Sequence, residues 1–188
     1  MSDPPTSDDT LVARVGAGDA VACRELAERH LHRIVSLAYR LLGNHADAED
    51  VAQETFVRLW THAARWQPGG ARLTTWLHRV TLNLCRDHRA RRREQPLEAA
   101  GEPVDPRPSL ADAVHERTLA LHVSAALGSL PERQREAIVL CHYQGLGNIE
   151  AAVVLDVSVE ALESLLARGR RALRRRLAAV APALLGEG

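Results

Sequence analysis

The sequence predicts an all-α fold of two small helical domains joined by a flexible linker, on three observations. Helix-forming residues fill the chain, whereas the aromatic residues that favour strands are few, with Phe once and Tyr twice. Apolar residues recur at helical spacing along most of the chain. Residues 95–108, "QPLEAAGEPVDPRP", combine four prolines with acidic residues, as extended linkers do. We therefore place an N-terminal domain at 1–93, a linker at 94–112 and a C-terminal domain at 113–188.

The N-terminal domain is expected to hold four helices. Between residues 11 and 42 the helical pattern is interrupted by "GAGD", which predicts a short helix, a turn and a long helix. The pair "GN" ends the long helix, and the next helix covers residues 47–60. After a break at "QPGG", residues 67–70, the last helix runs from about 74 through 89 and closes in "RARRRE". From Arg72 to Glu94 this segment carries seven arginines against two acids, Asp87 and Glu94.

The C-terminal domain is expected to hold helices at about 110–127, 131–143, 148–155 and 159–179. The last two are separated by "DVS", a turn of the length that a helix-turn-helix uses. Ser158 suits the N-cap position of the final helix. The spacing therefore predicts a helix-turn-helix in this domain.

Two arginine-rich surfaces have alternative interpretations. On the final helix, Glu160, Ser164, Arg168 and Arg171 fall close to one stripe, which a helix-turn-helix would place in the major groove of DNA. Basic residues near a helix C-terminus also simply complement its dipole. The arginines of 72–93 could likewise be a solvated face or a phosphate-binding surface. Because the formal net charge is zero, only this uneven distribution favours nucleic acid.

Several classes of protein are disfavoured by what the sequence lacks. We find no phosphate-binding loop, dinucleotide fingerprint, nucleophile elbow or zinc-protease motif, so we expect no enzyme, cofactor or small-molecule substrate. Cys23, Cys85 and Cys141 are odd in number and widely spaced, which argues against disulfides and zinc sites and indicates a reducing compartment. Neither a signal peptide nor a membrane-spanning run is evident, so we expect a cytoplasmic protein without membrane insertion.

Three blocks in order resemble the extracytoplasmic-function (ECF, group IV) RNA polymerase sigma factors of the sigma-70 family. They are "GNHADAEDVAQETFVRLW", "LTTWLHRVTLNLCRDHRARRR" and "LGSLPERQREAIVLCHYQGLGNIEAAVVLDVSVEALESLLARGRRALRRRL". The resemblance implies a bacterial transcription initiation factor that binds core RNA polymerase and promoter DNA and is controlled by an anti-sigma factor. The first block implies docking on a coiled coil of the largest polymerase subunit, through Asp50, Gln53, Glu54, Arg58 and Leu59.

The second block resembles the part that binds the minus-ten promoter element. Family members extrude a base of the non-template strand into a pocket formed by the preceding loop, here "QPGGARLTT". Leu82 replaces a residue that is frequently basic in this block. The resemblance implies minus-ten contacts from Arg72, Thr74, Trp76, Arg79, Asn83 and Arg86.

The third block resembles the domain that reads the minus-thirty-five element. It departs from the family pattern at Asn148-Ile149, Ala161, Glu163 and Leu165. Glu163 could pair with Arg170 or Arg171, or accept a hydrogen bond from a cytosine amino group, and both remain open. The resemblance implies minus-thirty-five contacts from Glu160, Ser164, Arg168, Arg170 and Arg171.

Two other functions remain open from the sequence. A stand-alone helix-turn-helix regulator would explain the C-terminal half but leaves the acidic helix at 47–60 without a role. A sigma-like mimic that titrates an anti-sigma factor would use the same surface without initiating transcription. Binding to core polymerase and run-off transcription distinguish these alternatives.

Overall fold

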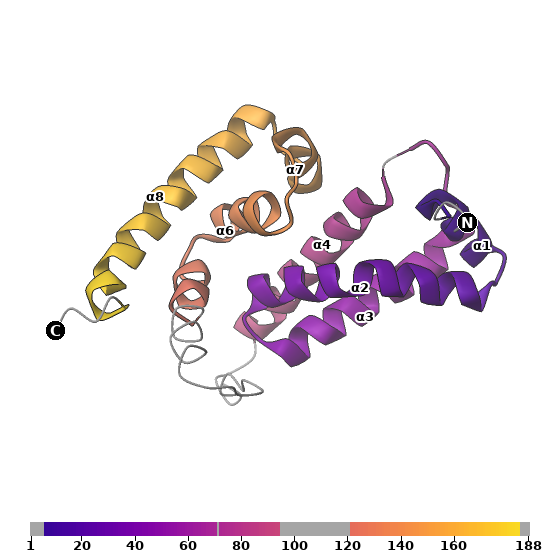
Figure 1. The fold of residues 1–188 in the computed structure, drawn as a ribbon, viewed down its shortest axis with the longest axis horizontal. Helices are drawn as coiled ribbons and strands as arrows, with labels where there is room; N and C mark the ends of the chain where they lie inside the picture. The colour runs from indigo at the N-terminus through magenta and orange to yellow at the C-terminus, as the bar shows by residue number, and fades with distance from the viewer. Residues whose placement is uncertain (1–5, 71, 95–120, 185–188) are drawn as a thin grey trace, which may run out of the picture.

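The computed structural model describes residues 6–70, 72–94 and 121–184, and this part of the chain is helical without a strand (Figure 1). The N-terminal half consists of α1 (Asp8–Gly16), α2 (Ala20–Leu42), α3 (His45–Ala63) and α4 (Leu73–Glu94). The C-terminal half begins with helical residues 121–128 and continues through α6 (Glu132–Ile138), the π-helical turn η1 (Val139–Tyr143), α7 (Asn148–Leu155) and α8 (Val159–Leu184). The expected linker beyond Glu94, and the start of the helix expected at 110, lie outside the described residues.

The turn between α1 and α2 and the turn between α2 and α3 each end one helix and cap the next. Asp19 of "GAGD" accepts hydrogen bonds from the backbone N–H groups of Val21 and Ala22 at 2.8 and 3.2 Å, and so caps α2. Gly43 adopts a left-handed conformation with φ 77°, which glycine tolerates without a Cβ clash, and Asn44 then caps α3. The predicted helix boundaries are therefore confirmed within a few residues.

One apolar core holds α1 to the other helices of the N-terminal half. Leu26 and Ile34 of α2 meet Phe56 of α3 and Leu77 of α4, and all four side chains are at most 3% exposed. The hydroxyl groups of Thr55 and Thr81 lie 3.2 Å apart between α3 and α4, and both residues are fully buried. The three long helices therefore pack as one rigid bundle.

The second apolar core is shared by both halves of the chain. It joins Leu37 of α2 and Leu82 of α4 to Leu140 of η1 and Leu155 of α7, all at most 1% exposed. Helix α4 packs on α7, and α2 packs on η1, so the two halves lie side by side in Figure 1. The π-helical turn η1 follows α6 and holds one residue more per hydrogen-bonded turn than an α-helix. It ends at Gln144, whose N–H donates to the carbonyl of Val139 at 3.0 Å.

The expected helix-turn-helix is present as α7, a turn and α8. Asp156 ends α7 in the left-handed region with φ 57°, which Asp tolerates better than most residues. The hydroxyl of Ser158 accepts a hydrogen bond from the N–H of Ala161 at 3.2 Å, which confirms its capping role. Arg133 of α6 donates to the carbonyl of Leu155 at 3.1 Å and fixes the end of α7.

Candidate functional site

Helix α3 presents an exposed polar face above a buried apolar one. Asp50, Gln53, Glu54 and Arg58 are exposed and recur at three- and four-residue spacing, so they share one face. Arg58 Nε donates to Glu54 Oε1 at 2.9 Å along the helix. Asp50 forms no hydrogen bond or ion pair with the side chains of the described residues, and it is exposed to solvent.

Leu59, expected among the polymerase-binding residues as a side chain packed beneath or beside the polar anchors, lies beneath them. The side chain is completely buried in the N-terminal core, so its role is to hold α3 in place rather than to touch a partner. Two apolar side chains do lie exposed on α3, namely Val57 at 39% and Trp60 at 41%. Sequence reasoning missed Val57, although its spacing from Asp50 and Gln53 places it among the polar residues of this face.

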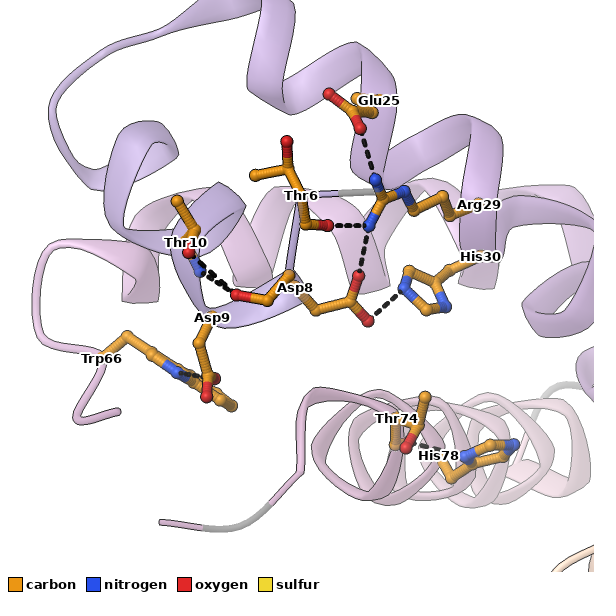
Figure 2. Close-up of polar contacts among 11 residues, drawn as sticks. Thr6, Asp8, Asp9, Thr10, Glu25, Arg29, His30, Trp66, Thr74 and His78 are labelled. Carbon is orange, nitrogen blue, oxygen red and sulfur yellow. Dashed lines mark hydrogen bonds and ion pairs between the residues drawn. The ribbon is translucent and has the colours of Figure 1, made fainter. Parts of the chain in front are cut away.

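A stripe of the residues expected to bind the minus-ten element runs along α4. Arg72, Trp76, Arg79, Asn83 and Arg86 follow one another at alternating four- and three-residue steps, so they line one side of the helix. Arg72, Arg79 and Asn83 are exposed, whereas Trp76 and Arg86 are partly buried. Thr74 lies off this stripe, and its carbonyl accepts a hydrogen bond from His78 Nδ1 at 2.5 Å (Figure 2).

The loop before α4 is bounded by aromatic side chains. The ring of Trp76 stacks on His62 with centroids 5.5 Å apart, and meets Trp66 edge-on at 6.2 Å. Trp66 Nε1 donates to Asp9 of α1 at 3.1 Å, as Figure 2 shows. Sequence reasoning singled out Trp76 alone, because the partners of Trp76 come from a separate helix and loop.

Helix α1 is fastened to α2 by ion pairs at the same end of the bundle (Figure 2). Arg29 donates to the carboxylate of Asp8 at 3.0 Å and to the carbonyl of Thr6 at 2.6 Å, and it also pairs with Glu25. The other oxygen of Asp8 lies 2.9 Å from Nε2 of His30, which is 8% exposed. Through Asp8 and Asp9, α1 connects the start of the bundle to the loop that precedes α4.

Leu82 and Cys85 belong to the shared core rather than to a binding surface. Leu82 is fully buried there, which explains an apolar side chain where the family is frequently basic. Burial, and then the nearby carboxylate of Glu136, raise the pKa of the Cys85 thiol to about 12. This thiol is therefore protonated at neutral pH and is a buried filler rather than a reactive sensor.

Helix α8 carries the exposed stripe expected to read the minus-thirty-five element. Glu160, Ser164, Arg168 and Arg171 are all exposed along its length, while Leu162 and Leu166 are buried beneath. Arg168 and Arg171 also line a shallow groove of about 660 Å³ between α8 and the start of α6, together with Arg175. Arg170 points elsewhere, since its Nε lies 3.1 Å from Nε2 of His142 in η1.

The described residues hold no group of three His, Cys, Asp or Glu side chains arranged to bind a metal ion. No helix in the described ranges combines the length and the apolarity that crossing a bilayer requires. The surfaces that remain are the polar face of α3 and the arginine-lined stripes of α4 and α8.

Two family models match the chain in order. Residues 26–95 match Sigma-70 region 2, and residues 121–173 match Sigma-70, region 4. Over 181 residues the chain is 38% identical to the ECF RNA polymerase sigma factor SigE of Mycolicibacterium smegmatis, covering 94% of this chain and 70% of SigE. Over 180 residues it is 33% identical to the RNA polymerase sigma factor CnrH of Cupriavidus metallidurans, covering 90% and 94% of the two chains.

Solved structures agree with these matches. The structure of CnrH in complex with the cytosolic domain of CnrY has a TM-score of 0.69 and 31% identity, over 92% of this chain and 97% of that chain. The sigma factor RpoE of Bartonella quintana, in complex with the anti-sigma factor NepR, has a TM-score of 0.65 over 82% and 95%; at 24% identity this likeness concerns the fold alone. With both regions matched in order and relatives matched over most of their length, the chain belongs to the extracytoplasmic-function sigma factors of the sigma-70 family.

Proposed function

We propose that this protein binds core RNA polymerase through the exposed face of α3 and directs promoter-specific transcription initiation without catalysing a reaction itself. The observation that carries the proposal is the arrangement of Asp50, Gln53, Glu54 and Arg58 around the exposed Val57. An apolar centre with a polar rim is typical of a protein interface. The buried side chains of Leu59 and Thr55 anchor α3 in the protein interior, so its exposed face stands on a rigid support.

The stripe on α4 is proposed to hold the opened minus-ten element. Arginines can bind the phosphates of a single strand, and the rings of Trp76 and Trp66 offer faces on which an unstacked base can stack. The edge-on contact of these rings leaves the aromatic faces at an angle to one another. Arg72 and Arg79 complete this surface at the loop end of α4, whereas Thr74 lies off it.

The stripe on α8 is proposed to read the minus-thirty-five element as duplex. A helix-turn-helix inserts the first turns of its second helix into the major groove, which places Glu160 and Ser164 toward base edges. Arg168 and Arg171 follow farther along α8, where the phosphate backbone passes. Arg170 could join them only by giving up its contact with His142.

We also propose control by an anti-sigma factor and action in the bacterial cytoplasm. The support comes from a relative: CnrH was solved in complex with the cytosolic domain of CnrY, and a chain of that structure matches 92% of this chain. A partner of this kind would cover the polymerase-binding or DNA-binding faces.

Run-off transcription with purified core RNA polymerase tests the proposal directly. Supplying the protein to core enzyme on fragmented DNA of its own genome should yield discrete transcripts that core alone does not make. Binding to core enzyme without transcripts would instead favour a mimic that titrates an anti-sigma factor. Tight binding to a palindromic duplex without affinity for core would favour a stand-alone regulator.

Charge reversal on α3 tests the proposed polymerase face. Asp50→Lys and Glu54→Lys should each weaken binding to core enzyme at least tenfold. A polymerase surface that is complementary to these carboxylates is basic, so each lysine would face a like charge across a partly desolvated interface. Glu28→Lys makes the same change of charge on an exposed position of α2 and should leave binding unchanged. If a folded variant that carries both Asp50→Lys and Glu54→Lys bound core enzyme as tightly as the wild type, this face of α3 would not be the polymerase-binding surface.

A further inference from the structure

Arginines gather along the groove between α8 and the start of α6. The groove has a volume of about 660 Å³, with α8 as one wall and residues 129–134 as the other. Helix α8 packs closely on α6 at Gly169, where a Cβ would lie 3.4 Å from the carbonyl oxygen of Gln134, and the groove lies beside this crossing (Figure 1). Its basic lining residues are Arg168, Arg171, Arg175 and Arg176.

No carboxylate balances these guanidinium groups among the described residues that line the groove. The two acids of α6 are engaged with α4 instead. Glu132 pairs with Arg89 at 3.4 Å, and Glu136 pairs with Arg86 at 2.7 Å. The positive charge of the groove is therefore not neutralised by the helix that forms its other wall.

The arginines of the groove also carry N–H groups that the fold does not use. Arg168 donates from Nε to the carbonyl of Ser164 at 3.2 Å, which leaves its two terminal nitrogens for a ligand. The side chains of Arg171, Arg175 and Arg176 are exposed and form no hydrogen bond or ion pair with the described residues. Like charges at three- and four-residue spacing on a helix repel one another, so an anion between them is favoured.

A promoter duplex accounts for only part of this row. The major groove of DNA is about 12 Å wide and takes the first turns of a recognition helix. At a rise of about 1.5 Å per residue, Arg175 and Arg176 lie about 22 to 24 Å along α8 from Glu160. These two arginines therefore lie beyond the part of α8 that a major groove holds.

The other lining residues suit a small ligand. Leu130, Pro131 and Ala172 give the groove an apolar surface beside the arginines, and Gln134 adds a polar side chain. A volume of this size falls in the range of small-molecule sites, which run from about 300 to 1,000 Å³. The groove can therefore hold a chain of anionic groups along α8 together with an apolar group opposite.

We propose that this groove binds a small polyphosphate, the chemical class that includes inorganic tripolyphosphate and nucleoside triphosphates. Guanidinium groups bind phosphate oxygens through paired N–H donors, so a row of arginines matches consecutive phosphate groups. The site itself does not depend on the proposed function. One consequence does rest on it: the ligand occupies Arg168 and Arg171, which are also proposed to bind promoter DNA.

Isothermal titration calorimetry of the full-length protein at constant ionic strength tests the site. Tripolyphosphate and ATP should each bind as one molecule per chain, orthophosphate should bind at least tenfold more weakly than tripolyphosphate, and adenosine should not bind detectably. Equal affinities for ATP and tripolyphosphate would identify the phosphate chain as the whole ligand. A higher affinity for ATP would show that the nucleoside packs on the apolar residues of the groove.

Substitutions on α8 locate the site. Arg175→Gln and Arg176→Gln should each weaken tripolyphosphate binding at least fivefold. The matched control Arg174→Gln removes the same charge from an exposed residue of the same helix that does not line the groove, and its affinity should stay within twofold of the wild type. Far-UV circular dichroism checks that all three variants fold.

Two results would overturn the proposal. One is the absence of saturable tripolyphosphate binding by the wild-type protein. The other is an equal loss of affinity in Arg174→Gln and Arg175→Gln, which would mean a diffuse attraction to a basic helix rather than a site.

Competition with DNA tests the consequence separately. At constant ionic strength, saturating tripolyphosphate should weaken the binding of a random-sequence duplex at least threefold in the wild type and in Arg174→Gln, and less in Arg175→Gln. A duplex affinity that bound tripolyphosphate leaves unchanged would refute the shared use of Arg168 and Arg171. Run-off transcription tests the proposed function independently, so its failure would leave the calorimetric result standing.

Discussion

Asn148 and Glu163 contact one another across the helix-turn-helix, with Nδ2 of the amide 3.3 Å from Oε1 of the carboxylate. Both residues depart from the family pattern, and the structure shows that the two departures form one pair. Asn148 begins α7, and Glu163 lies in the second turn of α8. Arg170 is not its partner, because that side chain binds His142. The acid is therefore held at the exposed edge of the recognition helix.

Glu163→Lys is expected to tighten binding to duplex DNA. The change removes an acid that would lie near phosphates and adds a cation that can neutralise one, releasing a counterion. The slope of log K against log salt should become steeper by about 0.9. Fluorescence anisotropy of a random-sequence duplex at several salt concentrations measures both effects. Glu28→Lys, with the same change of charge on α2, should retain the wild-type slope; an equal change in both variants would place α8 away from the DNA.

Gly169→Ala is expected to destabilise the protein, although alanine favours helices. A Cβ at Gly169 would lie 2.9 Å from Cγ1 of Ile138 and 3.4 Å from the carbonyl oxygen of Gln134, because α8 crosses α6 closely at this point. Overpacking of this kind typically costs about 1–3 kcal/mol, more than the ~1 kcal/mol gained in helix propensity. Urea unfolding followed by circular dichroism measures the difference.

Gly128→Ala is the matched control for that substitution. Gly128 also lies in a helical segment, but a Cβ there meets no atom within 4 Å. The change should be neutral or stabilise by up to about 1 kcal/mol. Equal stabilisation by both substitutions would show that α8 and α6 do not cross as closely as described.

Trp66→Phe is expected to loosen the loop before α4 while leaving the bundle folded. The substitution removes the indole N–H that Asp9 accepts at 3.1 Å and shortens the edge that meets Trp76. Loss of one such hydrogen bond costs about 1–1.5 kcal/mol. Hydrogen exchange of residues 64–70 should accelerate, whereas the exposed Trp60→Phe should not affect it. Unchanged exchange in Trp66→Phe would mean that the loop is held by other contacts.

The helices and their caps could be predicted because their signals are local. Asp19, Asn44 and Ser158 each cap a helix by binding N–H groups two or three residues away. The exposed stripes of α3 and α8 follow from helical periodicity for the same reason. Leu59 follows the apolar spacing of α3, and the structure buries it beneath the polar anchors.

The interface between the halves could not be predicted, because each of its contacts joins distant residues. A row of arginines such as that of α4 has the same sequence pattern whether it faces water, phosphate or carboxylate. Glu136 falls within a conventional helical turn, and nothing in the periodicity shows that it is buried against Arg86. The apolar pattern likewise shows that Leu82 is buried without showing that the C-terminal half covers it.

The buried histidine at this interface makes stability depend on pH. His78 is 1% exposed, its Nε2 has no hydrogen-bond partner among the described residues, and Arg33 of α2 and Glu150 of α7 are the charged groups facing it. Burial lowers the pKa of His78, with Arg33 acting in the same direction, while the Thr74 carbonyl, Gln144 and Glu150 oppose the shift. The folded protein therefore resists protonation at a pH where the unfolded chain accepts a proton.

The sign of the effect follows from this depressed pKa. The contribution of His78 to the free energy of unfolding is complete above the pKa of about 6.5 that the side chain has in the unfolded chain. This contribution is lost as the pH falls from there toward the lower pKa of the folded protein. One proton limits the slope to about 1.4 kcal/mol per pH unit. Urea unfolding between pH 5.5 and 7.5 should show stability rising with pH in the wild type and a flatter profile in His78→Gln. The exposed His62→Gln should keep the wild-type profile, and an unchanged slope in His78→Gln would assign the pH dependence to other groups.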